Sequence, residues 1–142
     1  MKPFKQICAD TKPKNLELFR KCMEKNDCVQ YMDAFLSEAP KDSAIDFPKS
    51  YCLVTEHYFC SYRWYWAKEL RVIPLTEISN LYRTNLDAEG NYDFKDFRLN
   101  VECKDGKEFF MSSSPRSAKT VDTLYDDVIT CVKKRIADLE VM

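Results

Sequence analysis

The feature that most constrains the fold is a long apolar stripe near the C-terminal end of the chain. Apolar side chains recur there at spacings of three and four residues, the period of one helix face. They are Val121, Leu124, Tyr125, Val128, Ile129, Val132, Ile136 and Leu139. Ser114 and Pro115 are preferred at the N-cap and first position of a helix, so we expect the helix to begin there. Because so many apolar side chains would be unfavourable in water, we expect this helix face to be buried against a sheet.

The residues before this helix are typical of an antiparallel hairpin. In residues 97–103 apolar and polar side chains alternate, and the alternation resumes in residues 107–112. Between them, Asp105-Gly106 predicts a two-residue type I′ turn, because Asp and Gly tolerate positive φ angles.

Further strands are expected upstream of the hairpin. Residues 51–66 are dense in aromatic and β-branched side chains, which predicts two strands joined by a tight turn near residues 55–57. Residues 70–75 and 78–84 are two more candidate strands. Pro74 lacks an N–H donor, which places it at a strand end, an edge or a bulge. The polar residues 87–93 are expected to form a loop.

The N-terminal part is predicted to be helical. Residues 14–39 contain no glycine and show helical spacing, which indicates one interrupted helix or two short ones. Pro13 suits a first helical position, and Pro40 ends the run. Asn26-Asp27 is the expected break, with Asp27 able to cap the second piece.

These elements define a fold class and a division of the chain. We expect an α+β, mainly β protein: an antiparallel β-sandwich, or partly open barrel, capped by the C-terminal α-helix. Residues 1–45 would form an N-terminal helical extension, and residues 46–142 one compact β-rich domain.

Three short segments of the β-rich part carry a resemblance to a known family. They are residues 53–59 (Leu-Val-Thr-Glu-His-Tyr-Phe), residues 73–78 (Ile-Pro-Leu-Thr-Glu-Ile) and the hairpin at residues 97–109. Together they make residues 51 to about 139 resemble bacterial pleckstrin-homology-like (PH-like) domains, including the GRAM-type branch. The resemblance implies a seven-strand sandwich with a capping helix. It also implies a non-enzymatic module that binds lipid headgroups, peptides or protein partners.

Composition excludes several common chemistries. The chain of 142 residues has two glycines, too few for a dinucleotide-binding or Walker-type phosphate loop. His57 is the only histidine, which excludes HExxH and three-histidine metal sites. With 22 basic and 23 acidic residues and no strongly basic segment, nucleic acid is not an expected partner. We expect no metal and no cofactor.

The seven cysteines are expected to be reduced and buried. Their number is odd and no pair is spaced as CxxC. A catalytic role would need Cys52 or Cys60 beside His57, but the odd offsets place each pair on opposite faces of a regular strand. Only a turn between them could bring Cys52 to His57. We therefore assign no catalytic residue and do not expect an enzyme.

A basic and aromatic segment supplies the candidate binding residues, which are Arg63, Trp64, Trp66, Lys68 and Arg71. Arginine can hold phosphate through its planar guanidinium, and tryptophan suits a membrane interface, so anionic phospholipid is one candidate ligand. Alternatively, the rings fill the core or a protein interface and the basic groups are solvated.

Three functional hypotheses follow. The leading one is a PH-like protein-interaction or scaffold module with a protein or peptide partner, and a homodimer stays open. The second is peripheral binding to anionic lipid, and the third is a small enzyme with a Cys nucleophile. The sequence lacks both a secretory signal and a membrane-spanning run, so we expect a cytoplasmic protein, peripheral at the membrane under the lipid hypothesis.

Overall fold

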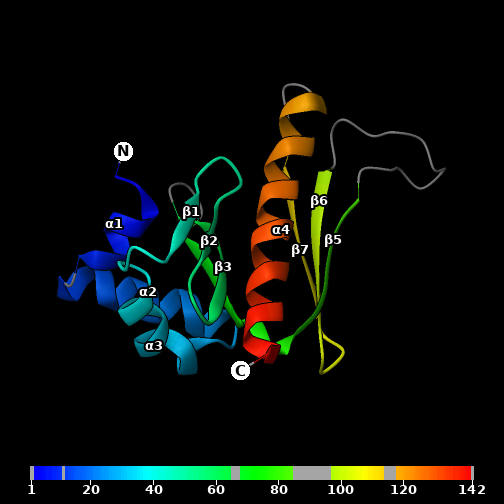
Figure 1. Cartoon of the computed structure of the whole chain (residues 1–142). Coiled ribbons are helices and arrows are strands. Elements are labelled where there is room, and N and C mark those ends of the chain that lie inside the picture. Colours follow the sequence, from blue (N-terminus) through cyan, green and yellow to red (C-terminus); the bar gives the residue numbers. More distant parts are fainter. Residues whose placement is uncertain (1, 11, 65–67, 85–96, 114–117, 142) are drawn as a thin grey trace. The chain divides into compact units, whose positions relative to one another are not determined.

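A computed structural model describes residues 2–10, 12–64, 68–84, 97–113 and 118–141. It has an α+β fold with a four-stranded and a three-stranded antiparallel sheet, N-terminal helices and a C-terminal helix (Figure 1). The expected fold class is confirmed at this level, and the described strands form no closed barrel. The chain divides into two compact units, Met1–Leu75 and Thr76–Met142. The boundary predicted from the sequence, between residues 45 and 46, lies inside the first unit.

The first unit holds the N-terminal helices and the four-stranded sheet. Its helical segments are α1 (Phe4–Ala9), α2 (Pro13–Lys25), the 3-10 turn η1 (Val29–Tyr31) and α3 (Met32–Glu38). Its strands pair in the order β1 (Ile45–Phe47), β2 (Cys52–Val54), β3 (Tyr58–Arg63) and β4 (Glu69–Pro74). All neighbouring strands run antiparallel. Helices and sheet share one core, so the N-terminal helices belong to the same unit as these strands.

The helices follow the sequence prediction in part. Pro13 lies in the first turn of α2, this helix ends at Asn26, and α3 ends before Pro40, as expected. The predicted cap at Asp27 is wrong. Asp27 has a left-handed φ of 55°, and the 3-10 turn that follows has no side-chain cap. Helix α1 and strand β1 were not predicted, because six and three residues are too few to show a period.

The strands of the first unit confirm the expected pattern. A tight turn joins β2 to β3, where the Thr55 N–H donates to the Tyr58 carbonyl at 2.9 Å. Pro74 is the last residue of β4, an edge strand, where proline is tolerated.

Alternate strand residues build the sheet face that packs on the helices. Leu53, Cys60 and Val72 lie opposite one another in register and belong to the core that the helices share. The largest helix side chains in this core are fully buried: Phe4, Phe19, Met23 and Phe35. Aromatic side chains of both the helices and the strands therefore pack helix against sheet in this unit.

The second unit is a three-stranded sheet with the C-terminal helix along one face (Figure 1). The 3-10 turn η2 (Leu75–Glu77) leads into β5 (Ile78–Thr84), and β6 (Phe97–Cys103), β7 (Glu108–Ser113) and α4 (Ala118–Val141) follow. Arg83 and Leu81 share the inner sheet face, and the Arg83 Nε lies 3.9 Å from a carboxylate oxygen of Asp126 on α4. The buried side chains of this helix include Tyr125, Val128 and Val132. The amphipathic C-terminal helix is thus confirmed, while its expected start and the expected 87–93 loop lie outside the described residues.

The hairpin between β6 and β7 has the expected position but a different turn. The Cys103 N–H donates to the Lys107 carbonyl at 2.8 Å, and the Gly106 N–H donates to the Cys103 carbonyl at 3.0 Å. Gly106 has a φ of +90°, whereas Asp105 is not in the positive-φ region. The type I′ prediction is therefore wrong. The loop has three residues and places glycine at the one left-handed position that this geometry requires.

Candidate functional site

Trp64, one of the sequence-predicted binding residues, lies in the core of the first unit. Trp64 is 4% exposed, and its ring stacks on the Phe19 ring with 4.7 Å between the two ring centroids. Phe4 meets the same ring edge-on at 6.0 Å. The Lys68 ammonium lies 4.7 Å from the Trp64 ring centroid, so this cation covers the ring instead of standing beside an exposed tryptophan.

The two arginines of the predicted site lie on the other face of the sheet. Arg63 pairs in register with Glu69, and Arg71 pairs with Ser61, out of phase with the core residues of both strands. An Nη2 nitrogen of Arg71 donates to the Asn26 side-chain oxygen at 3.2 Å. Trp66 lies outside the described residues. The structure therefore brings Lys68 and Trp64 together and places Arg63 and Arg71 on a different face.

Side chains from the end of α2 bind the outer edge of β4. The Cys22 thiol donates to the Lys68 carbonyl at 2.8 Å, and the Asn26 amide donates to the Leu70 carbonyl at 2.8 Å. Edge-strand carbonyls that are already hydrogen-bonded cannot pair with another strand. The backbone of Lys68 and Leu70, within the predicted basic segment, thus lies at the seam between helix and sheet in this unit.

The cysteines have the environment of packing residues. All seven are thiols, and six of them are buried. Burial raises the pKa of Cys52 and of Cys60, which disfavours the thiolate that a nucleophile needs. The His57 Nδ1 lies 2.6 Å from the Glu38 carboxylate, and the Cys52 thiol donates to the Ser50 carbonyl at 3.3 Å.

This environment predicts a distinct pattern of alkylation. With iodoacetamide near neutral pH, we expect Cys131, which is half-buried, to react first. Cys52 and Cys60 should react at least about 100-fold more slowly, because a buried thiol reacts only when the fold opens. Peptide mass spectrometry of the native protein checks this, with the urea-unfolded chain as the control. Rapid, selective labelling of Cys52 or Cys60 would instead support a nucleophile.

A buried carboxylate ties the end of α3 to the β2–β3 turn. One Glu38 oxygen accepts the Thr55 hydroxyl at 2.7 Å and the His57 backbone N–H at 2.9 Å, and the other lies 2.6 Å from the His57 Nδ1. Burial raises the pKa of Glu38, but these hydrogen bonds outweigh burial and hold it below its ordinary value of 4.5. Each Glu38 carboxylate oxygen has a partner within the cluster, which marks it as a structural tie.

The outer face of the β5–β7 sheet carries exposed aromatic side chains. Tyr82, Asn100 and Phe110 lie side by side across the three strands, and we call them the aromatic row. Phe110 is 58% exposed and Tyr82 is 37% exposed. The Arg98 guanidinium lies 4.5 Å from the Phe110 ring centroid.

Acidic groups flank the aromatic row on one side. Glu102 and Glu108 lie opposite each other on β6 and β7, one row away on the same face. Glu102 is hydrogen-bonded to the Tyr82 side chain, and Glu108 is exposed. The surface therefore combines exposed rings with a negative border.

Sequence reasoning missed the aromatic row, although one indication was present. In the alternating pattern of residues 107–112, Phe110 falls in the phase that points away from Leu99 and Val101, where a polar residue is expected. An apolar ring at a strand position that faces solvent is the feature that could have revealed the aromatic row.

Comparison with known proteins identifies no relative: no family model, no curated protein and no solved structure matches the chain. Among the residues that the structure describes, no cluster of His, Cys, Asp or Glu side chains could hold a metal ion. No helix in this part of the chain is long and apolar enough to cross a membrane.

Proposed function

We propose that the chain is a non-enzymatic, PH-like binding module whose ligand is a protein partner. The observation that carries the proposal is the aromatic row, because exposed Phe and Tyr rings are characteristic of protein interfaces. The succession of four strands, three strands and a C-terminal helix supports the PH-like part of the proposal.

The surface chemistry defines the kind of partner. The rings of Tyr82 and Phe110 favour an apolar or aromatic side chain, which would bury them. Glu108 has no ion-pair partner among the described residues and favours a basic group beside that side chain. The expected partner is thus a protein surface that presents an apolar residue next to Lys or Arg.

Photo-crosslinking tests this proposal. The change Phe110→p-benzoylphenylalanine places a reactive ketone in the aromatic row, and the same change at Lys107, in the neighbouring turn, is the control. In an extract of the source organism, we expect one protein to be crosslinked from position 110 and not from position 107. With that protein purified, Phe110→Ala should weaken binding by roughly 10- to 30-fold, the effect of losing an interface hot spot, and Lys107→Ala should leave it unchanged.

Three outcomes would overturn the proposal. One is crosslinking that is equal at both positions, and another is binding that is unchanged in Phe110→Ala. The third is a crosslink to a second copy of the chain, which would identify a homodimer face instead.

Co-sedimentation with vesicles separates the lipid alternative from this proposal. Trp64 is buried beneath Lys68, so we expect no salt-sensitive binding to vesicles that contain anionic phospholipid. Binding that is lost when Arg63, Lys68 and Arg71 are all replaced by Ser would favour the lipid alternative.

A further inference from the structure

A groove of about 340 Å³ lies within the second unit, between the start of β5 and the last two turns of α4. Two features of the fold open it. The register of β5 against β6 shifts between Ile78 and Asn80, and the Ser79 hydroxyl at this bulge donates to the Glu102 carbonyl at 3.0 Å. On the helix, Ala137 is one of the four residues that line the groove, and its small side chain leaves space beside Ile136.

The floor of the groove is apolar. Ile78 and Leu81 are 3% and 1% exposed, and half-buried Ile136 closes the helix side. Because Ile78 and Leu81 are already buried, the apolar surface that a ligand can reach on the helix side belongs to Ile136 and to exposed Ala137.

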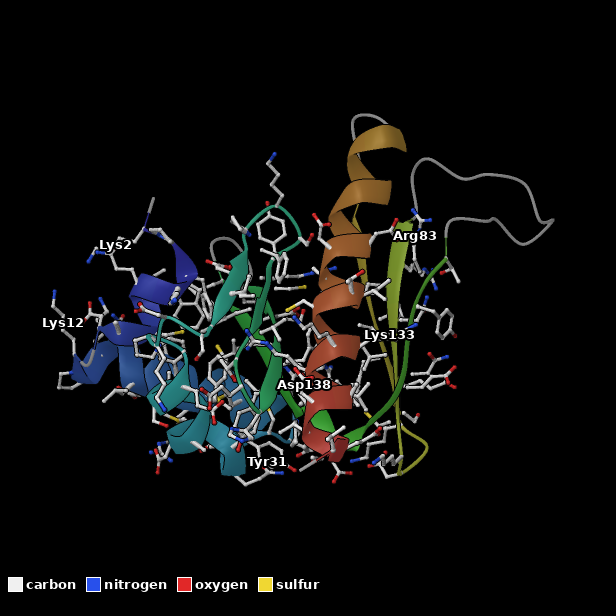
Figure 2. All side chains as sticks on the ribbon, in the orientation of Figure 1. Lys2, Lys12, Tyr31, Arg83, Lys133 and Asp138 are labelled. Carbon is white, nitrogen blue, oxygen red and sulfur yellow. The ribbon has the colours of Figure 1, made fainter. Side chains whose placement is uncertain are left out.

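Two lysines stand at the rim of the same groove. Lys133 comes from α4, on the side that faces β5 (Figure 2), and Lys104 comes from the β6–β7 turn. The Lys104 N–H donates to the Glu77 carbonyl at 2.8 Å, which fixes that turn beside the start of β5. Neither ammonium has an ion-pair partner among the described residues, so both are available to an anion.

One acidic residue limits the charge of that anion. Glu140 also lines the groove, seven positions after Lys133, which is about 10 Å along a helix axis and too far for an ion pair. Two lysines and one glutamate leave a single net positive charge. A monoanion matches this charge, whereas a phosphate dianion would meet repulsion from Glu140.

We propose that this groove binds a small monocarboxylate with an apolar tail, of the chemical class of a medium-chain fatty acid. The tail would lie against Ile136 and Ala137, above the buried Ile78 and Leu81, and the carboxylate would lie between Lys104 and Lys133. The volume is near the lower end of the range of small-molecule sites, about 300 to 1,000 Å³, which fits a short chain and not a whole phospholipid. This groove is separate from the aromatic row, so failure of the carboxylate proposal would not affect the proposal of a protein partner, or the reverse.

Titration with octanoate below its micelle concentration tests the proposal, followed in the ¹H–¹⁵N spectrum of the full chain. We expect saturable shifts at residues 78–81 and 133–140, and at least tenfold weaker binding of octanol, which has the same tail without the charge. Lys104→Met and Lys133→Met should each weaken octanoate binding by roughly tenfold, as expected for a lost charge-assisted hydrogen bond. Lys134→Met, one position along the helix, is the matched control and should change it less than about twofold.

A second variant tests the shape of the groove. Ala137→Leu would fill the space and should abolish saturable octanoate binding, with circular dichroism to confirm folding. If Ala137→Leu does not fold, the Lys104→Met and Lys133→Met variants still test whether octanoate binds in the groove. The proposal is overturned by equal binding of octanol and octanoate, by tighter binding of octyl phosphate, or by binding that the lysine variants leave unchanged. It is also overturned if an acidic, leucine-containing peptide binds and octanoate does not.

Discussion

Replacing Trp64 by alanine is expected to lower the free energy of unfolding of the first unit by about 3 to 5 kcal/mol. The ring is 4% exposed and packs between Phe19, Phe4 and the Lys68 ammonium. Truncation would remove the ring contacts and leave a cavity that the rigid aromatic neighbours cannot close. Urea unfolding followed by far-ultraviolet circular dichroism measures the effect without relying on tryptophan fluorescence.

Two further variants identify the cause of that loss. Trp64→Phe retains an aromatic ring and should lose clearly less stability than Trp64→Ala. Lys68→Met removes only the cation over the ring, which at an exposed position contributes about 0.5 to 1 kcal/mol. If Trp64→Ala unfolds at the same urea concentration as the unmodified chain, Trp64 is not a core residue, and its role in ligand binding becomes the better explanation.

The sequence predicted the strands and long helices because their signals are local. The alternation in residues 97–112 and the stripe in residues 121–139 each repeat several times within one element, and β5 was placed at its observed bounds. Helix α1 and strand β1 lack such repetition. Their few residues are held by contacts far along the chain, such as the stack of Phe4 on Tyr62 at 4.0 Å between ring centroids.

The candidate site was harder to predict, because it depends on which face each side chain occupies. Arg63 and Trp64 are neighbours in sequence, but Arg63 ends β3 out of phase with the core residues of that strand, and Trp64, just after the strand, belongs to the core. Composition shows one basic and aromatic cluster, whereas the fold keeps Lys68 over Trp64 and places Arg63 and Arg71 elsewhere. The groove has the opposite origin: Lys104 and Lys133 are 29 positions apart in the sequence, and both line it because a hairpin turn and the helix end lie beside the start of β5.

Replacing Glu38 by glutamine is expected to lower the free energy of unfolding by about 2 kcal/mol at pH 7, because the carboxylate accepts charge-assisted hydrogen bonds from Thr55 and His57. Glutamine keeps the shape but loses the charge. Urea unfolding at a series of pH values measures the difference between the two proteins. Glu24→Gln, an exposed position on α2, is the matched control and should change stability by less than about 0.5 kcal/mol.

The pH dependence of that difference has a definite sign. The folded-state pKa of Glu38 lies below its ordinary value of 4.5, so the carboxylate contributes its full stability above that value. As the pH falls below about 4.5, the unfolded chain binds the proton first, and the contribution is lost as the pH passes through the folded-state pKa. The advantage of the unmodified chain over Glu38→Gln should therefore shrink below pH 4.5. An advantage that is as large at pH 3 as at pH 7 would show that Glu38 stabilises the turn through packing and not through its charge.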